Sequence, residues 1–210
     1  MAPNRNLARS TRPHIQERTS APKFVLLDRD GVINRRIPGG YVTSWESFEF
    51  LPGALEAFKL LAENGYETLV ISNQAAVGMK LMTSDELGLL TRQFEREVEK
   101  KGGRIRGVFY CTHRKEDGCK CRKPRPGLFL EARRQHHLHF NETVLIGDSE
   151  SDALAANLVG CPFIHIAEAE ALPSHTFKNP PLATVRSLLE AVQFLLASTP
   201  AVNLRTSATP

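Results

Sequence analysis

The chain has 210 residues, a formal net charge of +4 and a charged fraction of 24%, which together suit one globular domain with a well-buried core. No apolar run is long enough for a membrane-crossing helix, and we see no apolar core of a secretory signal near the N-terminus. We therefore expect a cytoplasmic protein with no membrane partner, and the modest charge excess favours no nucleic-acid partner.

The first 22 residues are rich in arginine and contain a single acidic residue, Glu17. This composition is typical of a disordered basic extension, and an organelle transit peptide is the alternative. We expect residues 1–22 to be such an extension, residues 23–197 to form a single domain, and residues 198–210 to be a disordered tail.

Short apolar runs recur along the chain and predict strands. Continuous runs of leucine and β-branched residues are typical of strands that are buried on both faces of a parallel sheet. We predict such strands at residues 23–27, 68–71, 108–110, 143–146 and 163–166.

Helical patterns lie between these strands. Thr83 and Glu86 have the spacing of a capping box, and an apolar stripe at helical spacing follows them. Strand–helix alternation predicts an α/β fold: a doubly wound, Rossmann-like parallel sheet in a three-layer sandwich. In such sheets, ligands bind beyond the carboxyl ends of the strands. The predicted helices are residues 52–64, 83–101, 128–138, 151–159 and 185–196.

Two carboxylates, Asp28 and Asp30, follow the first predicted strand, and Gly31 permits a sharp turn there. One carboxylate can attack phosphorus and form an acyl-phosphate that water hydrolyses. The second can protonate the leaving group and then activate that water. Taken alone, the four residues 28–31 are also typical of a turn in which Asp caps the next segment.

Three further segments supply complementary groups. Ser72 and Asn73 follow the second strand and can donate to phosphoryl oxygens, although a helix cap is the alternative. Arg122 and Lys123 provide cations stiffened by neighbouring prolines, with a solvated basic patch as the alternative. Asp148 follows the fourth strand. Clustered carboxylates repel one another unless a cation lies among them, and Mg²⁺ suits all-oxygen ligands.

Three of the four cysteines fall within eleven positions, next to a histidine. Cys111, His113, Cys119 and Cys121 form a set that can bind Zn²⁺ tetrahedrally. Such a site leaves no position for water, so the zinc would be structural and would hold the basic loop that follows. Unconnected polar residues and a zinc ribbon on nucleic acid are the alternatives. We expect Cys161 to be a buried small apolar residue.

Four of these segments contain the candidate phosphate-transfer residues Asp28, Ser72, Lys123 and Asp148. In this order they resemble the haloacid dehalogenase superfamily of aspartate-nucleophile phosphatases. The resemblance covers residues 23–166 and implies that the domain is a phosphatase domain. It implies that Asp28 is the nucleophile and Asp30 the general acid/base. It also implies that Ser72 and Lys123 stabilise the phosphoryl group.

The resemblance further implies that Asp28, Asp148 and the backbone carbonyl of Asp30 hold Mg²⁺. The cysteine–histidine loop, followed by Arg-Lys-Pro, is similar to that of the heptose-bisphosphate phosphatases and the related histidinol-phosphate phosphatases. The stretch Asp-Arg-Asp-Gly-Val-Ile-Asn at residues 28–34 resembles the heptose branch more closely.

That branch implies hydrolysis of the 7-phosphate of D-glycero-D-manno-heptose 1,7-bisphosphate. Asn73, Arg122 and Lys123 would bind this small sugar phosphate, without a large cap domain, in a monomer or small homo-oligomer. Met79 stands where these enzymes usually carry Arg, and Ser149 where they usually carry Lys, so two recognition positions are altered. The alternatives are histidinol-phosphate hydrolysis, DNA 3′-phosphatase activity, and a non-catalytic phosphate- or nucleic-acid-binding module.

Overall fold

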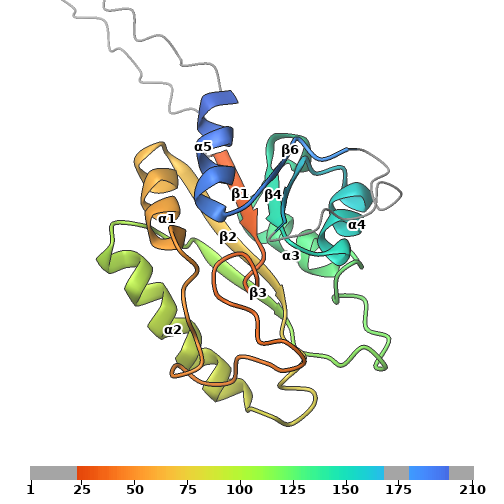
Figure 1. Cartoon of the computed structure of the whole chain (residues 1–210). Helices are drawn as coiled ribbons and strands as arrows, with labels where there is room; N and C mark the ends of the chain where they lie inside the picture. Colours follow the sequence, from red (N-terminus) through yellow and green to blue (C-terminus); the bar gives the residue numbers. More distant parts are fainter. Residues whose placement is uncertain (1–22, 168–179, 199–210) are drawn as a thin grey trace, which may run out of the picture.

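The computed structural model describes residues 23–167 and 180–198. Within these ranges six parallel strands form one sheet in the order β3-β2-β1-β4-β5-β6. This order confirms the predicted doubly wound sheet. Figure 1 shows β1, β2 and β4 near the middle of this sheet. The predicted disordered segments, 1–22 and all but the first residue of 198–210, lie outside the described residues. The strands are β1 (Lys23–Leu27), β2 (Tyr66–Asn73), β3 (Gly107–Cys111), β4 (Val144–Gly147), β5 (Phe163–Ile166) and β6 (Ala183–Val185).

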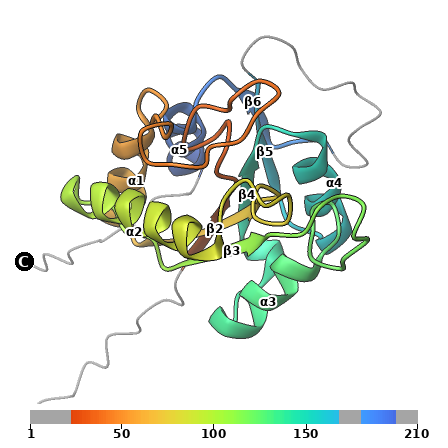
Figure 2. The same cartoon turned by 90° about the horizontal axis from the view of Figure 1, so that it is seen from below.

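Helices cover both faces of the sheet and complete the predicted three-layer sandwich (Figure 2). On one face, α1 (Ala54–Glu63), α2 (Ser84–Lys100) and α5 (Leu188–Ser198) share a core with the side chains of Val25 and Leu27. On the other face, α3 (Gly127–His136) and α4 (Glu150–Val159) pack against Phe24 and Leu26. Successive residues of β1 thus enter opposite cores, which is why its sequence is a continuous apolar run.

The local sequence accounts for the longest helix. The Thr83 hydroxyl accepts from the Glu86 amide at 3.2 Å, and the Glu86 carboxylate accepts from the Thr83 amide at 2.7 Å. This capping box satisfies two amides that a helix start leaves unpaired. The buried residues of α2 recur at helical spacing, as predicted: Leu87, Leu90, Phe94 and Val98.

One strand was missed. The pattern assigned Val185 to the start of the last helix, but it pairs with Ile166 at the end of β6, and α5 begins at Leu188. A three-residue edge strand carries almost no periodicity of its own. It forms because β5 offers it a hydrogen-bonding partner.

The chain between β1 and α1 is a loop that forms no cap domain, and its buried side chains Ile33 and Phe48 join the core beneath α1 and α2. Short backbone pairings fold it back on itself: Arg35 N donates to Glu49 O at 2.8 Å, and Leu51 N donates to Ile33 O at 3.0 Å. Trp45 and Phe48 stack above the core, with ring centroids 5.3 Å apart. None of the described helices meets the length and hydropathy needed to cross a bilayer.

Candidate active site

The site lies where the strand order reverses, between β1 and β4. Asp28 directly follows β1, and its amide donates to the Ile146 carbonyl at 3.0 Å. Asp148 directly follows β4, and it lies with Asp28 and Asp152 in a group whose ligand oxygens are all within 4.8 Å of one another. Burial, together with the neighbouring carboxylates, raises the pKa of Asp148 to about 8. The site therefore concentrates negative charge that a cation would relieve.

Lys123 supplies one such cation from the loop before α3. Its Nζ lies 2.9 Å from an Asp28 oxygen and 2.6 Å from an Asp152 oxygen, and it donates to the Ile71 carbonyl at 2.8 Å. Burial alone would lower the pKa of Lys123, but the two carboxylates raise it above its usual value. The side chain is therefore a fixed, charged neighbour of Asp28.

Asp152 was not among the predicted site residues. Its carboxylate accepts from the Ser149 amide at 3.2 Å in a capping box, and its other oxygen pairs with Lys123. The spacing of Ser149 and Asp152 signals the cap. The ion pair between Lys123 and Asp152 joins residues far apart in sequence, so no local pattern predicts it.

Asn73 and Ser72 both lie at the end of β2, but their side chains face different partners. The Asn73 amide accepts from Lys123 N at 3.0 Å and donates to Lys123 O at 3.2 Å, so it clamps the backbone of that residue. The buried Ser72 hydroxyl accepts from Gln74 Nε2 at 3.1 Å and lines the cavity above Asp28. Both predicted residues are thus at the site, Asn73 through Lys123.

The Asp30 carboxylate has donors on both oxygens. Arg29 Nη2 lies 2.9 and 3.0 Å from them, Asn34 Nδ2 donates at 2.8 Å and Gln74 Nε2 at 2.7 Å. Arg29 is wholly buried, and its guanidinium lies 5.9 Å from the Tyr110 ring centroid. Nothing in the local sequence marks Arg29 for this role, because an arginine between two aspartates carries no signal of burial.

The predicted zinc ligands meet in one cluster beside β3. The three sulfur–sulfur distances among Cys111, Cys119 and Cys121 are 3.3, 3.5 and 3.6 Å. His113 Nδ1 lies 3.3 Å from Cys121 Sγ and 3.7 Å from Cys111 Sγ. Ligands about 2.3 Å from a tetrahedral ion are themselves about 3.7 Å apart, so this donor set fits Zn²⁺. The separate Cys161 is buried, as expected.

Comparison with known proteins connects this geometry to a family. The family described as "HAD-hyrolase-like" matches residues 120–191. The chain is 39% identical over 134 residues to the D-glycero-beta-D-manno-heptose-1,7-bisphosphate 7-phosphatase of Helicobacter pylori, covering 63% of this chain and 76% of the relative. The corresponding alpha-heptose enzyme of Mycobacterium tuberculosis is 38% identical over 146 residues, covering 69% and 77%. The chain belongs to this family of HAD-like heptose-bisphosphate phosphatases.

A solved member of the heptose-bisphosphate phosphatase family has the same architecture. The D,D-heptose 1,7-bisphosphate phosphatase from B. bronchiseptica, complexed with magnesium and phosphate, superposes with a TM-score of 0.76 at 27% identity. The match covers 84% of this chain and 99% of that one. It confirms the fold predicted from strand–helix alternation, including the absence of a cap domain from the described residues.

The oxygen atoms at the centre of this phosphatase fit Mg²⁺. Arg36 Nη2 lies 3.0 and 2.8 Å from the two Asp148 oxygens and 3.4 Å from the Asp30 carbonyl oxygen, so a cation already lies among two of the expected ligands. Gly31 has a φ of 90°, and a Cβ there would overlap Asp148 Oδ2. The turn is thus shaped to bring the Asp148 carboxylate against the backbone beside Asp30.

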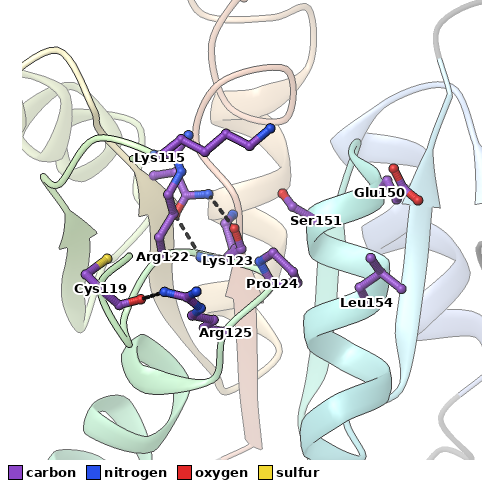
Figure 3. A pocket seen from close by; sticks show the side chains of 10 residues that line it. Lys115, Cys119, Arg122, Lys123, Pro124, Arg125, Glu150, Ser151 and Leu154 are labelled. Atoms are coloured by element: carbon purple, nitrogen blue, oxygen red, sulfur yellow. Dashed lines mark hydrogen bonds between the residues drawn. The ribbon is translucent and has the colours of Figure 1, made fainter. Parts of the chain in front are cut away.

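Two cavities adjoin the phosphatase site. One, of about 420 Å³, opens above Asp28 and Ser72 and is bordered by Arg36 and Tyr41. The second, of about 550 Å³, lies between the basic loop and α4 (Figure 3). The two share four lining residues: Asn73, Arg122, Lys123 and Ser151. The cavities are therefore contiguous at the catalytic end of the sheet.

The second cavity has a basic wall. Figure 3 shows Lys115, Arg122 and Arg125 along the loop, opposite Glu150 and Leu154 of α4. Arg125 donates to the Cys119 carbonyl, and Arg122 donates to the His113 carbonyl at 3.4 Å. Both arginines are therefore held by the backbone of the cysteine–histidine cluster.

Proposed function

We propose that this protein hydrolyses the 7-phosphate of D-glycero-D-manno-heptose 1,7-bisphosphate in a magnesium-dependent reaction through an aspartyl-phosphate on Asp28. The observation that carries the proposal is the position of Asp28 at the end of β1, 2.9 Å from a buried ammonium and within 4.8 Å of Asp148. Family membership supports the substrate, since the relatives named above carry that activity in their names.

In the first step an Asp28 oxygen attacks phosphorus, and the bond between phosphorus and the sugar oxygen breaks. Asp30 gives its proton to the departing alkoxide. Lys123 neutralises charge on the nucleophile and the phosphoryl oxygens, and Ser72 donates to those oxygens. Asp30 then takes a proton from water as that water attacks the aspartyl-phosphate and releases inorganic phosphate.

Asp28, Asp148 and the Asp30 carbonyl would hold Mg²⁺. When bound, the ion offsets negative charge on the phosphoryl group and orients it for in-line attack. Gln74 donates to both Asp30 and Ser72, so the acid/base and the phosphoryl donor belong to one hydrogen-bonded network.

We propose that Cys111, His113, Cys119 and Cys121 bind structural zinc. The same loop carries Arg122 and Lys123, so its geometry sets where both cations lie. Asn73 contributes from the end of β2 by holding the Lys123 backbone. Zinc and Asn73 thus act together on the position of one ammonium.

The basic cavity suits the rest of a doubly phosphorylated substrate. With one phosphate at Asp28, the sugar would lie along Arg122, which lines both cavities. The second phosphate would then contact Lys115 and Arg125 in the second cavity. Guanidinium groups bind phosphate with paired hydrogen bonds, which favours this orientation. Histidinol phosphate has no second phosphate to place there.

The test is a kinetic comparison of the purified full-length protein on three substrates: the beta and alpha anomers of the heptose bisphosphate, and histidinol phosphate. We expect kcat/KM for one bisphosphate anomer to exceed that for histidinol phosphate by about 10²-fold or more. The product should retain its 1-phosphate by phosphorus NMR. A preference for histidinol phosphate would overturn the proposed substrate. Binding of all three compounds without turnover would overturn the proposed phosphatase activity.

A further inference from the structure

Arg36 has one nitrogen in contact with two of the three proposed magnesium ligands. Its Nη2 touches both oxygens of the Asp148 carboxylate and lies 3.4 Å from the Asp30 carbonyl oxygen. The side chain comes from the loop after β1 and is about half exposed, at 53%. Its neighbour Arg35 points elsewhere and pairs with Glu49 at the surface. The two adjacent arginines therefore have separate environments.

The charges explain why Arg36 lies there. Lys123 bridges Asp28 and Asp152, which leaves Asp148 as the member of the carboxylate group that Lys123 does not pair. Arg36 pairs with that remaining carboxylate. A magnesium ion held by Asp148 and the Asp30 carbonyl would need the same oxygen atoms. It would also repel the guanidinium, so the two cations exclude each other.

We infer that Arg36 is an internal counter-ion that occupies the magnesium site of the metal-free enzyme and is displaced when the metal binds. The inference rests on the proposed magnesium site. An ion pair with one half-exposed partner is weak, so its loss costs the enzyme little and the exchange is reversible.

The displaced side chain stays on the wall of the cavity above Asp28, together with Tyr41 and Arg122. There its guanidinium faces the space that an anionic substrate enters. Metal binding thereby frees a cation for phosphate. Because coupling between two sites is reciprocal, phosphate should in turn tighten metal binding.

The test is a titration of the full-length protein, exchanged into magnesium-free buffer with its zinc retained, with Mn²⁺ followed by electron paramagnetic resonance. We expect Arg36→Gln to bind Mn²⁺ about two- to fivefold more tightly than the wild type, because it has no internal competitor to displace. Arg35→Gln removes an equal charge at the adjacent residue and should leave the Mn²⁺ affinity unchanged. Equal or weaker binding by Arg36→Gln, with an unchanged melting temperature, would overturn the inference.

A second measurement uses inorganic phosphate as the anion. Phosphate should tighten Mn²⁺ binding more in the wild type than in Arg36→Gln. Equal tightening in both proteins would overturn the claim that the displaced Arg36 guanidinium interacts with the anion. Asp148→Asn separates this inference from the proposed metal site. If the wild type binds Mn²⁺ and Asp148→Asn does not, the proposed metal site is supported. The comparison of the wild type with Arg36→Gln then decides whether Arg36 is the internal counter-ion. If the wild type binds no Mn²⁺, both fail.

Discussion

The Lys123 ammonium lies 2.6 Å from the Asp152 carboxylate and 2.9 Å from that of Asp28. One buried cation thus joins a residue of the α4 capping box to the residue that follows β1. Asn73 holds the backbone of the same lysine from β2. Three elements that are distant in the chain therefore fix one charge beside the nucleophile, and each offers a place to perturb it.

Removing the Asp152 carboxylate should destabilise the protein and slow it. Asp152→Ala leaves Lys123 with one counter-ion and removes the half of the α4 capping box that accepts from the Ser149 amide. Breaking a buried pair from one side typically costs about 3–5 kcal/mol. We expect a large fall in melting temperature and at least about a tenfold fall in kcat. The exposed ion pair of Asp117 with Arg114 provides a control, since Asp117→Ala should leave the melting temperature nearly unchanged. Equal effects of the two variants would contradict the role given to Asp152.

Gly31 should tolerate no side chain, for a reason beyond its backbone angle. Gly31→Ala places a methyl group against the Asp148 carboxylate, whereas Gly39→Ala meets nothing within 4 Å. Both glycines have positive φ, 90° and 68° respectively, so both variants carry similar backbone strain. We expect Gly31→Ala to lose divalent-metal affinity, measured by Mn²⁺ titration, and Gly39→Ala to keep it. Loss in both would show that strain, and not the contact with Asp148, is responsible.

Zinc content should depend on the cysteine cluster alone. Cys121→Ser removes a thiolate from the four-ligand set, and we expect it to lose most of its zinc by elemental analysis and to melt at a lower temperature. Cys161→Ala also removes a thiol, but that sulfur is buried, contacts the Thr143 carbonyl and does not belong to the four-ligand group. It should therefore retain one zinc per chain. A wild-type protein purified without zinc would contradict the proposed site.

Asp28→Asn should abolish turnover without unfolding the protein. The amide cannot form the aspartyl-phosphate, so kcat should fall by at least about 10³-fold. Burial raises the pKa of Asp28 although the Lys123 ammonium opposes the rise, so the neutral amide removes an unfavourable buried charge while Asp152 still pairs with Lys123. We expect its melting temperature to equal or exceed that of the wild type. Activity retained after this change would refute attack by Asp28.

Sequence pattern was sufficient for the layers and for the order of the strands at the site, although β2 runs through Ser72 to Asn73, two residues beyond its predicted end. The continuous apolar run before Asp28 and the similar run before Asp148 predicted buried parallel strands, and the structure pairs Leu27 with Ile146 just before the two carboxylates. The spacing of Cys111, His113, Cys119 and Cys121 predicted a cluster because chelating residues close in sequence cannot lie far apart in space. The edge strand at Val185 was missed because its three residues take that conformation only against β5.

By itself, then, the sequence determined what is local: apolar periodicity, the cap at Thr83, and which functional side chains follow which strand. Only the tertiary structure decided which charges meet. Lys123 with Asp152, Asn73 with the Lys123 backbone, and Arg36 with Asp148 join residues that are between 29 and 112 positions apart. These pairings form because the sheet places the strand ends side by side and excludes water from between them. Neither effect can be predicted from a periodic pattern in the sequence.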